Sequence, residues 1–112
     1  MVIKNALAYA LEDRFPVNPG HTLIVPFRHV ASYFETTLDE RIAMLHLIDE
    51  AKDLLDHRYF PAGYNIGVNV GSRAGQTVMH AHVHLIPRYC GDVAKPRGGV
   101  RGVIPERQSY PP

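Results

Sequence analysis

The chain has 112 residues, of which 46% are hydrophobic and 21% charged, with a formal net charge of +1. This length predicts one domain, and near-neutral charge without a large basic block argues against a dedicated nucleic-acid-binding protein. The single cysteine, Cys90, permits neither an internal disulfide nor a multi-cysteine zinc site. We find no apolar run long enough for a transmembrane helix and no signal-peptide h-region, so we expect a cytoplasmic protein that binds neither membranes nor nucleic acids.

The N-terminal part of the chain predicts a hairpin. Residues 5–11 (NALAYAL) and 21–25 (HTLIV) have the apolar and β-branched character of strands. Residues 12–20 between them contain two prolines as well as Asn18 and Gly20, and these residues favour a turn or loop.

A long helix is predicted next, from about Leu38 to about Arg58. Thr37 and Glu40 have the spacing of a capping box, in which each residue satisfies a backbone amide of the other. One helix face is apolar and should face the core: Met44, Leu47, Ile48, Ala51, Leu54 and Leu55. Three further apolar residues lie off this stripe and could cover a loop or a partner subunit: Leu38, Ile42 and Leu45.

Two more strands and an irregular tail are predicted after the helix. Residues 64–70 (YNIGVNV) and 77–87 (TVMHAHVHLIP) have strand character, and residues 71–76 between them form a Gly-containing loop. Residues 1–88 would then be the core, and residues 89–112, rich in Gly, Pro and Arg, an irregular tail of the same domain.

Three histidines alternate with apolar residues in the last predicted strand. There His80, His82 and His84 would point to one face, and the residues between them to the other. Three neighbouring imidazoles would repel one another if all were protonated, so we expect mixed protonation states and a candidate functional site.

Three interpretations of this cluster compete. It could be a structural polar face, a metal site, or a site for phosphoryl or nucleotidyl transfer. A metal site is disfavoured because parallel side chains on one strand do not by themselves supply a tetrahedral ligand set, and no carboxylate lies at motif spacing. Phosphoryl chemistry is favoured because imidazole is both a nucleophile and a leaving group near neutral pH.

Residues 75–88 (GQTVMHAHVHLIPR) resemble the signature of the histidine triad, or HIT, family. Residues 19–26 (PGHTLIVP), followed by Arg28-His29-Val30, resemble the family's other marker, and residues 95–106 (KPRGGVRGVIPE) resemble a bacterial branch similar to diadenosine polyphosphate hydrolases. The resemblance implies an α+β fold, an antiparallel sheet with one long helix packed on it, in a homodimer. The cysteine pair that some members carry is absent, so we expect no structural zinc.

The resemblance also implies catalytic roles. His82 would attack the α-phosphate of a nucleotide and carry a nucleotidyl-histidine intermediate. His84 would contact that phosphate, and its backbone carbonyl would orient the His82 ring. His80 would be a buried support packed near His21.

The substrate-binding residues implied by the resemblance are Asp13, Asn69, Gly75, Gln76, Thr77 and His21. Asp13 would accept hydrogen bonds from the ribose hydroxyls, Asn69 would contact phosphate or leaving group, and Thr77 would lie near the scissile bond. Gly75 would let the backbone approach the phosphates.

The predicted function is a nucleotide hydrolase or transferase that cleaves at the α-phosphate of an adenosine-type nucleotide. The substrate would be a dinucleoside polyphosphate, a phosphoramidate or an acyl-adenylate. No cofactor is required and no metal site is expected, although a divalent ion could arrive with a polyphosphate. Alternatives are a nucleotide-binding regulatory module with little turnover and a metal-binding protein. Lys95, Arg97 and Arg101 either bring charge to distal phosphates or simply solvate the tail.

Overall fold

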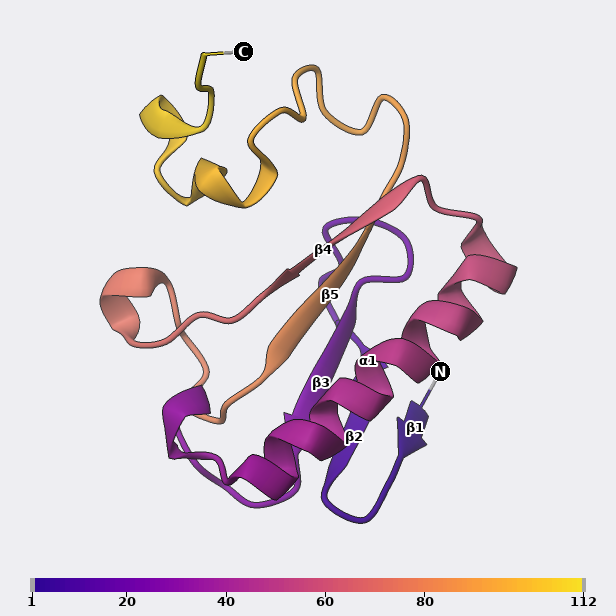
Figure 1. Cartoon of the computed structure of the whole chain (residues 1–112), viewed down its shortest axis with the longest axis vertical. Helices are drawn as coiled ribbons and strands as arrows, with labels where there is room; N and C mark the ends of the chain where they lie inside the picture. Colours follow the sequence, from indigo (N-terminus) through magenta and orange to yellow (C-terminus); the bar gives the residue numbers. More distant parts are fainter. Residues whose placement is uncertain (1, 112) are drawn as a thin grey trace.

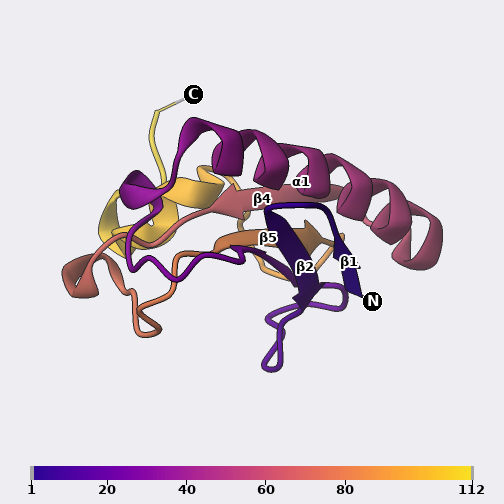
Figure 2. The same cartoon turned by 90° about the horizontal axis from the view of Figure 1, so that it is seen from below.

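The computed structural model describes residues 2–111; the ends of the predicted core and tail, Met1 and Pro112, lie outside the described residues. One long helix lies across one face of an antiparallel sheet (Figures 1 and 2). The elements are β1 (Val2–Lys4), β2 (Ala8–Glu12), β3 (Thr22–Pro26), α1 (Leu38–Tyr59), β4 (Gly63–Gly67) and β5 (Val83–Arg88), with 3-10 helices η1 (Tyr33–Glu35), η2 (Ser72–Ala74), η3 (Gly99–Val103) and η4 (Pro105–Arg107). The five strands have the order β1-β2-β3-β5-β4. The predicted α+β class, with one long helix packed on an antiparallel sheet, is confirmed.

Helix α1 begins with the predicted capping box. The Thr37 hydroxyl accepts the Glu40 amide at 3.1 Å, and a Glu40 carboxylate oxygen accepts the Thr37 amide at 2.8 Å. Arg28 donates to both Glu40 oxygens, at 2.8 and 3.1 Å. These hydrogen bonds, with Arg28 the largest cause, lower the pKa of Glu40 to about 2. The first turn of the helix is thereby tied to the segment that follows β3.

The core lies between α1 and the sheet. Its largest members come from the helix, from β3 and from β5: Met44, Leu47, Leu55, Ile24, Val83 and Leu85. The predicted helix stripe is correct except for Leu54, which is 44% exposed. Leu54 lies at the edge of the stripe, where the surface of the helix curves away from the core. Leu38, Ile42 and Leu45 are exposed, in keeping with their place off the stripe.

Three of the four predicted strands are shorter than expected, the one predicted at residues 21–25 is shifted by one residue, and one strand was missed. The hairpin predicted from residues 5–11 and 21–25 is β2–β3, with Glu12 opposite Thr22. The missed strand is β1, which pairs with β2. β2 begins only at Ala8 because the Asn5 Oδ1 accepts the amides of Leu7 and Ala8, which makes a turn before the strand.

The strand predicted at residues 77–87 extends only over β5, so His80 and His82 precede it. Pairing of β5 with β3 stops at Val83. Before that point the Ala81 amide donates to the Val30 carbonyl at 2.7 Å, and the Pro26 carbonyl faces the His80 ring at 2.8 Å. These bonds to the segment around the end of β3 replace a regular ladder and bring that segment next to the histidines.

The tail, predicted to be irregular, contains the 3-10 helices η3 and η4 but no strand or α-helix among its described residues. It lies beyond β4, away from α1 (Figure 1). Among residues 2–111, no helix combines the length and the apolar character that crossing a bilayer requires.

Candidate active site

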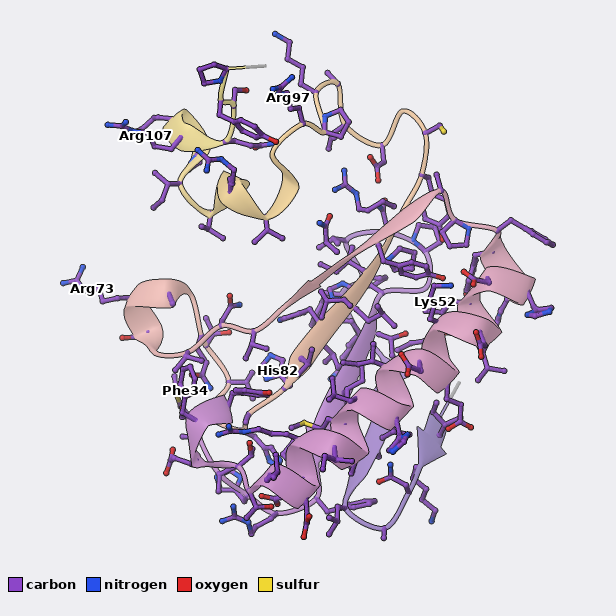
Figure 3. The ribbon with its side chains drawn as sticks, viewed as in Figure 1. Phe34, Lys52, Arg73, His82, Arg97 and Arg107 are labelled. Atoms are coloured by element: carbon purple, nitrogen blue, oxygen red, sulfur yellow. The ribbon has the colours of Figure 1, made fainter. Side chains whose placement is uncertain are left out.

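His82 lies just before β5 (Figure 3), and its two ring nitrogens have different surroundings. Its Nδ1 is 2.8 Å from the backbone carbonyl oxygen of His80. A carbonyl only accepts, so Nδ1 carries the proton of the neutral ring and Nε2 keeps its lone pair. The sequence interpretation gave this orienting role to the carbonyl of His84, which is wrong because the carbonyl belongs to His80. The ring is half-buried, and its free nitrogen has the electronic form of a nucleophile.

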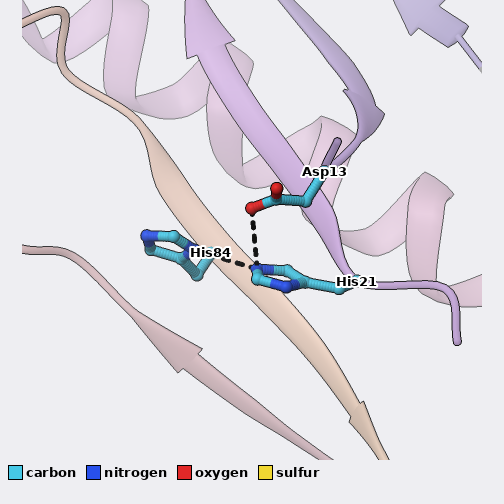
Figure 4. A group of neighbouring side chains, drawn as sticks. All are labelled: Asp13, His21 and His84. Carbon is cyan, nitrogen blue, oxygen red and sulfur yellow. Dashed lines mark hydrogen bonds and ion pairs between the residues drawn. The ribbon is translucent and has the colours of Figure 1, made fainter. Parts of the chain in front are cut away.

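His84, on β5, forms a hydrogen bond with His21 at the start of β3 (Figure 4). The Val17 amide donates to His21 Nδ1 at 3.1 Å, so this nitrogen carries no proton. The His21 proton is therefore on Nε2, which donates to His84 Nδ1 at 2.9 Å. It follows that neutral His84 carries its proton on Nε2, as a hydrogen-bond donor. The His82 and His84 rings lie edge to face, with centroids 5.0 Å apart.

Asp13 lies beside this pair at the end of β2. Its amide donates to the His21 carbonyl at 2.8 Å, which continues the β2–β3 ladder by one residue. One carboxylate oxygen accepts the Phe15 amide at 2.8 Å, and the other is 3.5 Å from His21 Nε2. The structure thus brings Asp13, His21 and His84 together, as Figure 4 shows.

His80 has a different neighbour from the one expected. Its Nδ1 is 3.0 Å from Nδ1 of His29, and its Nε2 faces the Pro26 carbonyl oxygen. The expectation that His80 packs near His21 is corrected, since the imidazole beside His21 is that of His84. His84 therefore pairs with His21 and His80 pairs with His29, and His82 lies between the two pairs in sequence.

The loop residues before the histidines divide into exposed and structural positions. Gly75 and Thr77 are exposed, and Gly75 has a φ of 98°, which glycine adopts without strain. The Gln76 side chain is buried, accepts the Gly71 amide and donates to the carbonyls of Ala31 and Val78. Because these bonds occupy both ends of the Gln76 amide, its side chain holds the loop rather than facing a substrate.

Asn69 shares a cavity with the histidine pair. A cavity of about 430 Å³ has Asn69, His21 and His84 in its wall and extends over β4 and β5 toward the tail. Asn69 and His84 thus line the same cavity.

Asp13, His21 and His84 also have the composition of a metal site, with ligand atoms within 4.8 Å of one another. The atom that His21 directs toward the group is Nε2, which carries a proton because Val17 donates to Nδ1. A protonated ring nitrogen cannot ligate a metal. This hydrogen-bond arrangement does not fit a divalent ion, and the expectation of no metal site remains a prediction.

Burial lowers the pKa of both His21 and His84 below the ordinary imidazole value of 6.5. For His21 the nearby Asp13 opposes this shift, whereas for His84 the charges of His82 and His21 add to it. At neutral pH both rings are accordingly neutral, the state that the hydrogen-bond chain requires.

These lowered pKa values predict a loss of stability in mild acid. Between the lower folded pKa and the ordinary value, the unfolded chain binds more protons than the folded chain, so stability falls as pH falls through this range. We expect a lower urea midpoint at about pH 5.5 than at about pH 7, and a smaller drop in His21→Gln. His46→Gln, at an exposed helix position, should keep the full drop. If the urea midpoint falls equally in the wild type, His21→Gln and His46→Gln, the loss of stability does not arise from the lowered pKa of His21.

A polar cluster beside the cavity was missed by the sequence analysis. Arg88 donates to both oxygens of Asp92, at 2.8 and 2.9 Å, and to Asn65 at 2.7 Å. Asn18 also donates to Asp92, at 2.8 Å. This clamp (Asn18, Asn65, Arg88 and Asp92) ties the β2–β3 loop, β4 and β5 to the start of the tail. Asn18, Asn65 and the Arg88–Asp92 pair are far apart in sequence, and only Arg88 belonged to a recognised motif.

The fold and the paired histidines define a small α+β protein with a histidine-lined face. Comparison with known families agrees, since the HIT domain model matches residues 1–91. The chain belongs to the HIT family.

Several curated proteins are similar to this chain. A 16.1 kDa HIT-like protein of Mycoplasma pneumoniae is 42% identical, with 77% of this chain and 60% of the relative covered. The AP-4-A phosphorylase of Mycobacterium tuberculosis is 34% identical, with 82% and 48% covered. The asymmetrical bis(5'-nucleosyl)-tetraphosphatase of Schizosaccharomyces pombe is 32% identical, with 82% and 50% covered. The chain thus spans less than two thirds of the length of each of these relatives.

Solved structures share the fold. The crystal structure of a HIT family protein from Bacillus anthracis is 33% identical and superposes with a TM-score of 0.77, covering 81% of this chain and 64% of that chain.

Proposed function

We propose that the protein is a nucleotide hydrolase or transferase that cleaves at the α-phosphate of an adenosine-type nucleotide through a nucleotidyl-histidine intermediate. The observation that carries the proposal is the His82 ring, whose Nδ1 proton is held by the His80 carbonyl so that Nε2 is free to attack. Relatives named as a phosphorylase of AP-4-A and as a tetraphosphatase support nucleotide cleavage.

The reaction proceeds in two displacements. His82 Nε2 forms a bond to the α-phosphorus while the bond to the leaving group breaks, and the leaving group departs with the bonding electron pair. Water, which loses a proton to the solvent, or phosphate in a transferase then attacks the phosphorus, and the electron pair of the P–N bond returns to Nε2. During both steps the proton stays on Nδ1 and remains hydrogen-bonded to the His80 carbonyl, and this bond supports the positive charge that the substituted ring carries.

In this mechanism the phosphate lies between His84 and Asn69. The His84 Nε2 proton is available as a donor to a phosphoryl oxygen, and the lowered pKa of His84 keeps that ring neutral. A donor that keeps its proton stabilises negative charge as it develops on the phosphoryl oxygens. Asp13 remains the proposed ribose ligand, because its carboxylate lies beside His21 at the edge of the same site.

The proposal extends to assembly and location. The protein acts as a cytoplasmic homodimer, and the exposed apolar residues Leu38, Ile42 and Leu45 on α1 are candidates for a subunit contact. It requires no cofactor and does not bind nucleic acid. Binding of nucleotides with little turnover is the alternative.

The deciding experiment is to trap the intermediate. A reaction with diadenosine tetraphosphate or adenosine phosphoramidate is quenched in alkali, digested with trypsin and examined by mass spectrometry. Cleavage after Arg73 and Arg88 gives a peptide that contains all three triad histidines, so fragmentation must assign the adenylyl group. We expect it on His82. Turnover with an adduct on His80 or His84, or with none, would contradict the mechanism, and absence of turnover would favour the binding module.

A further inference from the structure

One peptide group links the His82 ring to the segment that follows β3. The carbonyl oxygen of His80 is 2.8 Å from His82 Nδ1, and the amide of Ala81 donates to the Val30 carbonyl at 2.7 Å. The carbonyl and the amide belong to the same planar trans peptide, so they point in opposite directions. The bond to Val30 therefore sets the direction of the carbonyl that accepts from His82.

The His80 side chain is held at both of its ring nitrogens. Its Nε2 is 2.8 Å from the Pro26 carbonyl oxygen, and because a carbonyl only accepts, Nε2 carries the proton of the neutral ring. Nδ1 then keeps its lone pair and accepts from His29 Nδ1, which is 3.0 Å away. His29 is accordingly the donor of this bond.

His29 makes this contact from the surface of the molecule. Its side chain is exposed, whereas the His80 ring is half-buried. The two rings lie edge to face, with centroids 4.8 Å apart and planes at 79°. With its ring fixed at both nitrogens and the following amide fixed by Val30, His80 has little freedom to turn its carbonyl away from His82.

All three contacts to this peptide come from residues 26–30, which we call the brace. Pro26 and Val30 within it are buried. Arg28 donates to both carboxylate oxygens of Glu40, at 2.8 and 3.1 Å, and Glu40 is buried in the first turn of α1. The brace is thus tied to the helix on one side and to the catalytic histidines on the other.

We propose that His29 is a positioning residue for the nucleophile, which it serves by holding His80 so that the His80 carbonyl keeps the His82 proton on Nδ1. The importance of that proton rests on the proposed function. His29 acts through His80 and not on the substrate, since it does not line the cavity that contains His84.

The property that His29 controls is the tautomer of His82. A neutral histidine side chain that is free in water prefers its proton on Nε2, the nitrogen that has to attack phosphorus. The bond to the His80 carbonyl reverses this preference, because only a proton on Nδ1 can be donated to that oxygen. If the carbonyl turns away, Nε2 takes the proton and has no lone pair for the attack.

The first measurement is the tautomer of His82 in the full chain. The ¹⁵N chemical shifts of its ring nitrogens are recorded at about pH 8, where an ordinary imidazole is neutral, and are assigned by their loss in His82→Ala. We expect the Nδ1–H form in the wild type and a shift of the Nε2 resonance toward the protonated range in His29→Ala.

Two further variants separate the hydrogen bond from the ring contact. His29→Asn places an amide N–H close to the position of Nδ1 and should keep the wild-type tautomer of His82. His29→Phe keeps an aromatic ring beside His80 but has no donor, so it should resemble His29→Ala. His46→Ala, at an exposed position on α1, is the control and should leave the tautomer unchanged.

The second measurement is turnover of diadenosine tetraphosphate and of adenosine phosphoramidate. In His29→Ala and His29→Phe we expect kcat to fall about 10-fold to 100-fold, the scale on which misplacement of a catalytic group slows a reaction. The factor should be the same for both substrates, because His82 takes part in every displacement, and KM should stay within about twofold. His29→Asn should remain within about threefold of the wild type, and His46→Ala should be unchanged.

The outcomes separate this inference from the proposed function. If His82 keeps the Nδ1–H form in all three His29 variants, if His29→Asn is as slow as His29→Ala, or if only KM changes, His29 is not a positioning residue. If His29→Ala does not fold, the comparison of His29→Asn with His29→Phe decides, since both fill the space and only asparagine donates. If the wild type cleaves neither substrate, the proposed function fails, and the tautomer of His82 still tests the role of His29.

Discussion

Replacing His82 by alanine should lower kcat on the order of 10⁴-fold or more, as removal of a nucleophile does in other enzymes. The His82 Nδ1 proton is held by the His80 carbonyl, so Nε2 is unprotonated. Unlike His80 and His84, His82 has no hydrogen bond to another imidazole among the described residues. The variant loses the covalent route but keeps the residues proposed to hold the nucleotide. Its dissociation constant for AMP, measured calorimetrically, should stay within about fivefold of the wild type.

His57 provides a matched control for this prediction. Its Nδ1 also lies 2.8 Å from a backbone carbonyl oxygen, that of Asp53, but the ring is exposed on α1. His57→Ala should leave kcat within about twofold, as surface substitutions away from a site usually do. If His82→Ala retains even one hundredth of the activity, or if both variants lose similar activity, His82 is not the nucleophile.

His82 could be proposed as the nucleophile from sequence because the motif that carries the resemblance is local. Alternation placed Ala81, Val83 and Leu85 toward the core, and the structure buries all three. The tertiary partners of the histidines could not be predicted, because His21 meets His84 only through the β3–β5 register and His29 meets His80 only through the loop after β3. The proton positions depend on those partners and on the Val17 amide, which no side-chain pattern reveals.

The fold was predictable for similar reasons. A capping box and an apolar stripe depend on neighbouring residues, and both predicted α1 to within one residue at its C-terminal end. Strand ends depend on pairing, so the strand expected at residues 77–87 was too long, and β1, only three residues, left no readable pattern. The clamp unites residues from four segments, the β2–β3 loop, β4, β5 and the tail, so it could not be predicted from any local pattern.

His84→Ala should lower kcat by about 10² to 10³-fold, the usual cost of losing one preorganised donor to a developing charge. The chain from the Val17 amide through His21 leaves His84 with a proton on Nε2 and none on Nδ1. The lowered pKa of His84 means that the ring stays neutral, and a neutral imidazole does not readily give up its remaining proton. We therefore expect His84 to stabilise charge by donating a hydrogen bond without transferring the proton.

This role is distinguished from acid catalysis by a conservative variant. Glutamine also presents an N–H donor but cannot transfer a proton, so His84→Gln should recover kcat to within about tenfold of the wild type. The loss in His84→Ala should also be similar for amine and pyrophosphate-type leaving groups, since no proton is delivered to either. If His84→Gln is as slow as His84→Ala, and the loss is confined to amine substrates, His84 is a proton donor, and the hydrogen-bond chain from Val17 does not set its state during the reaction.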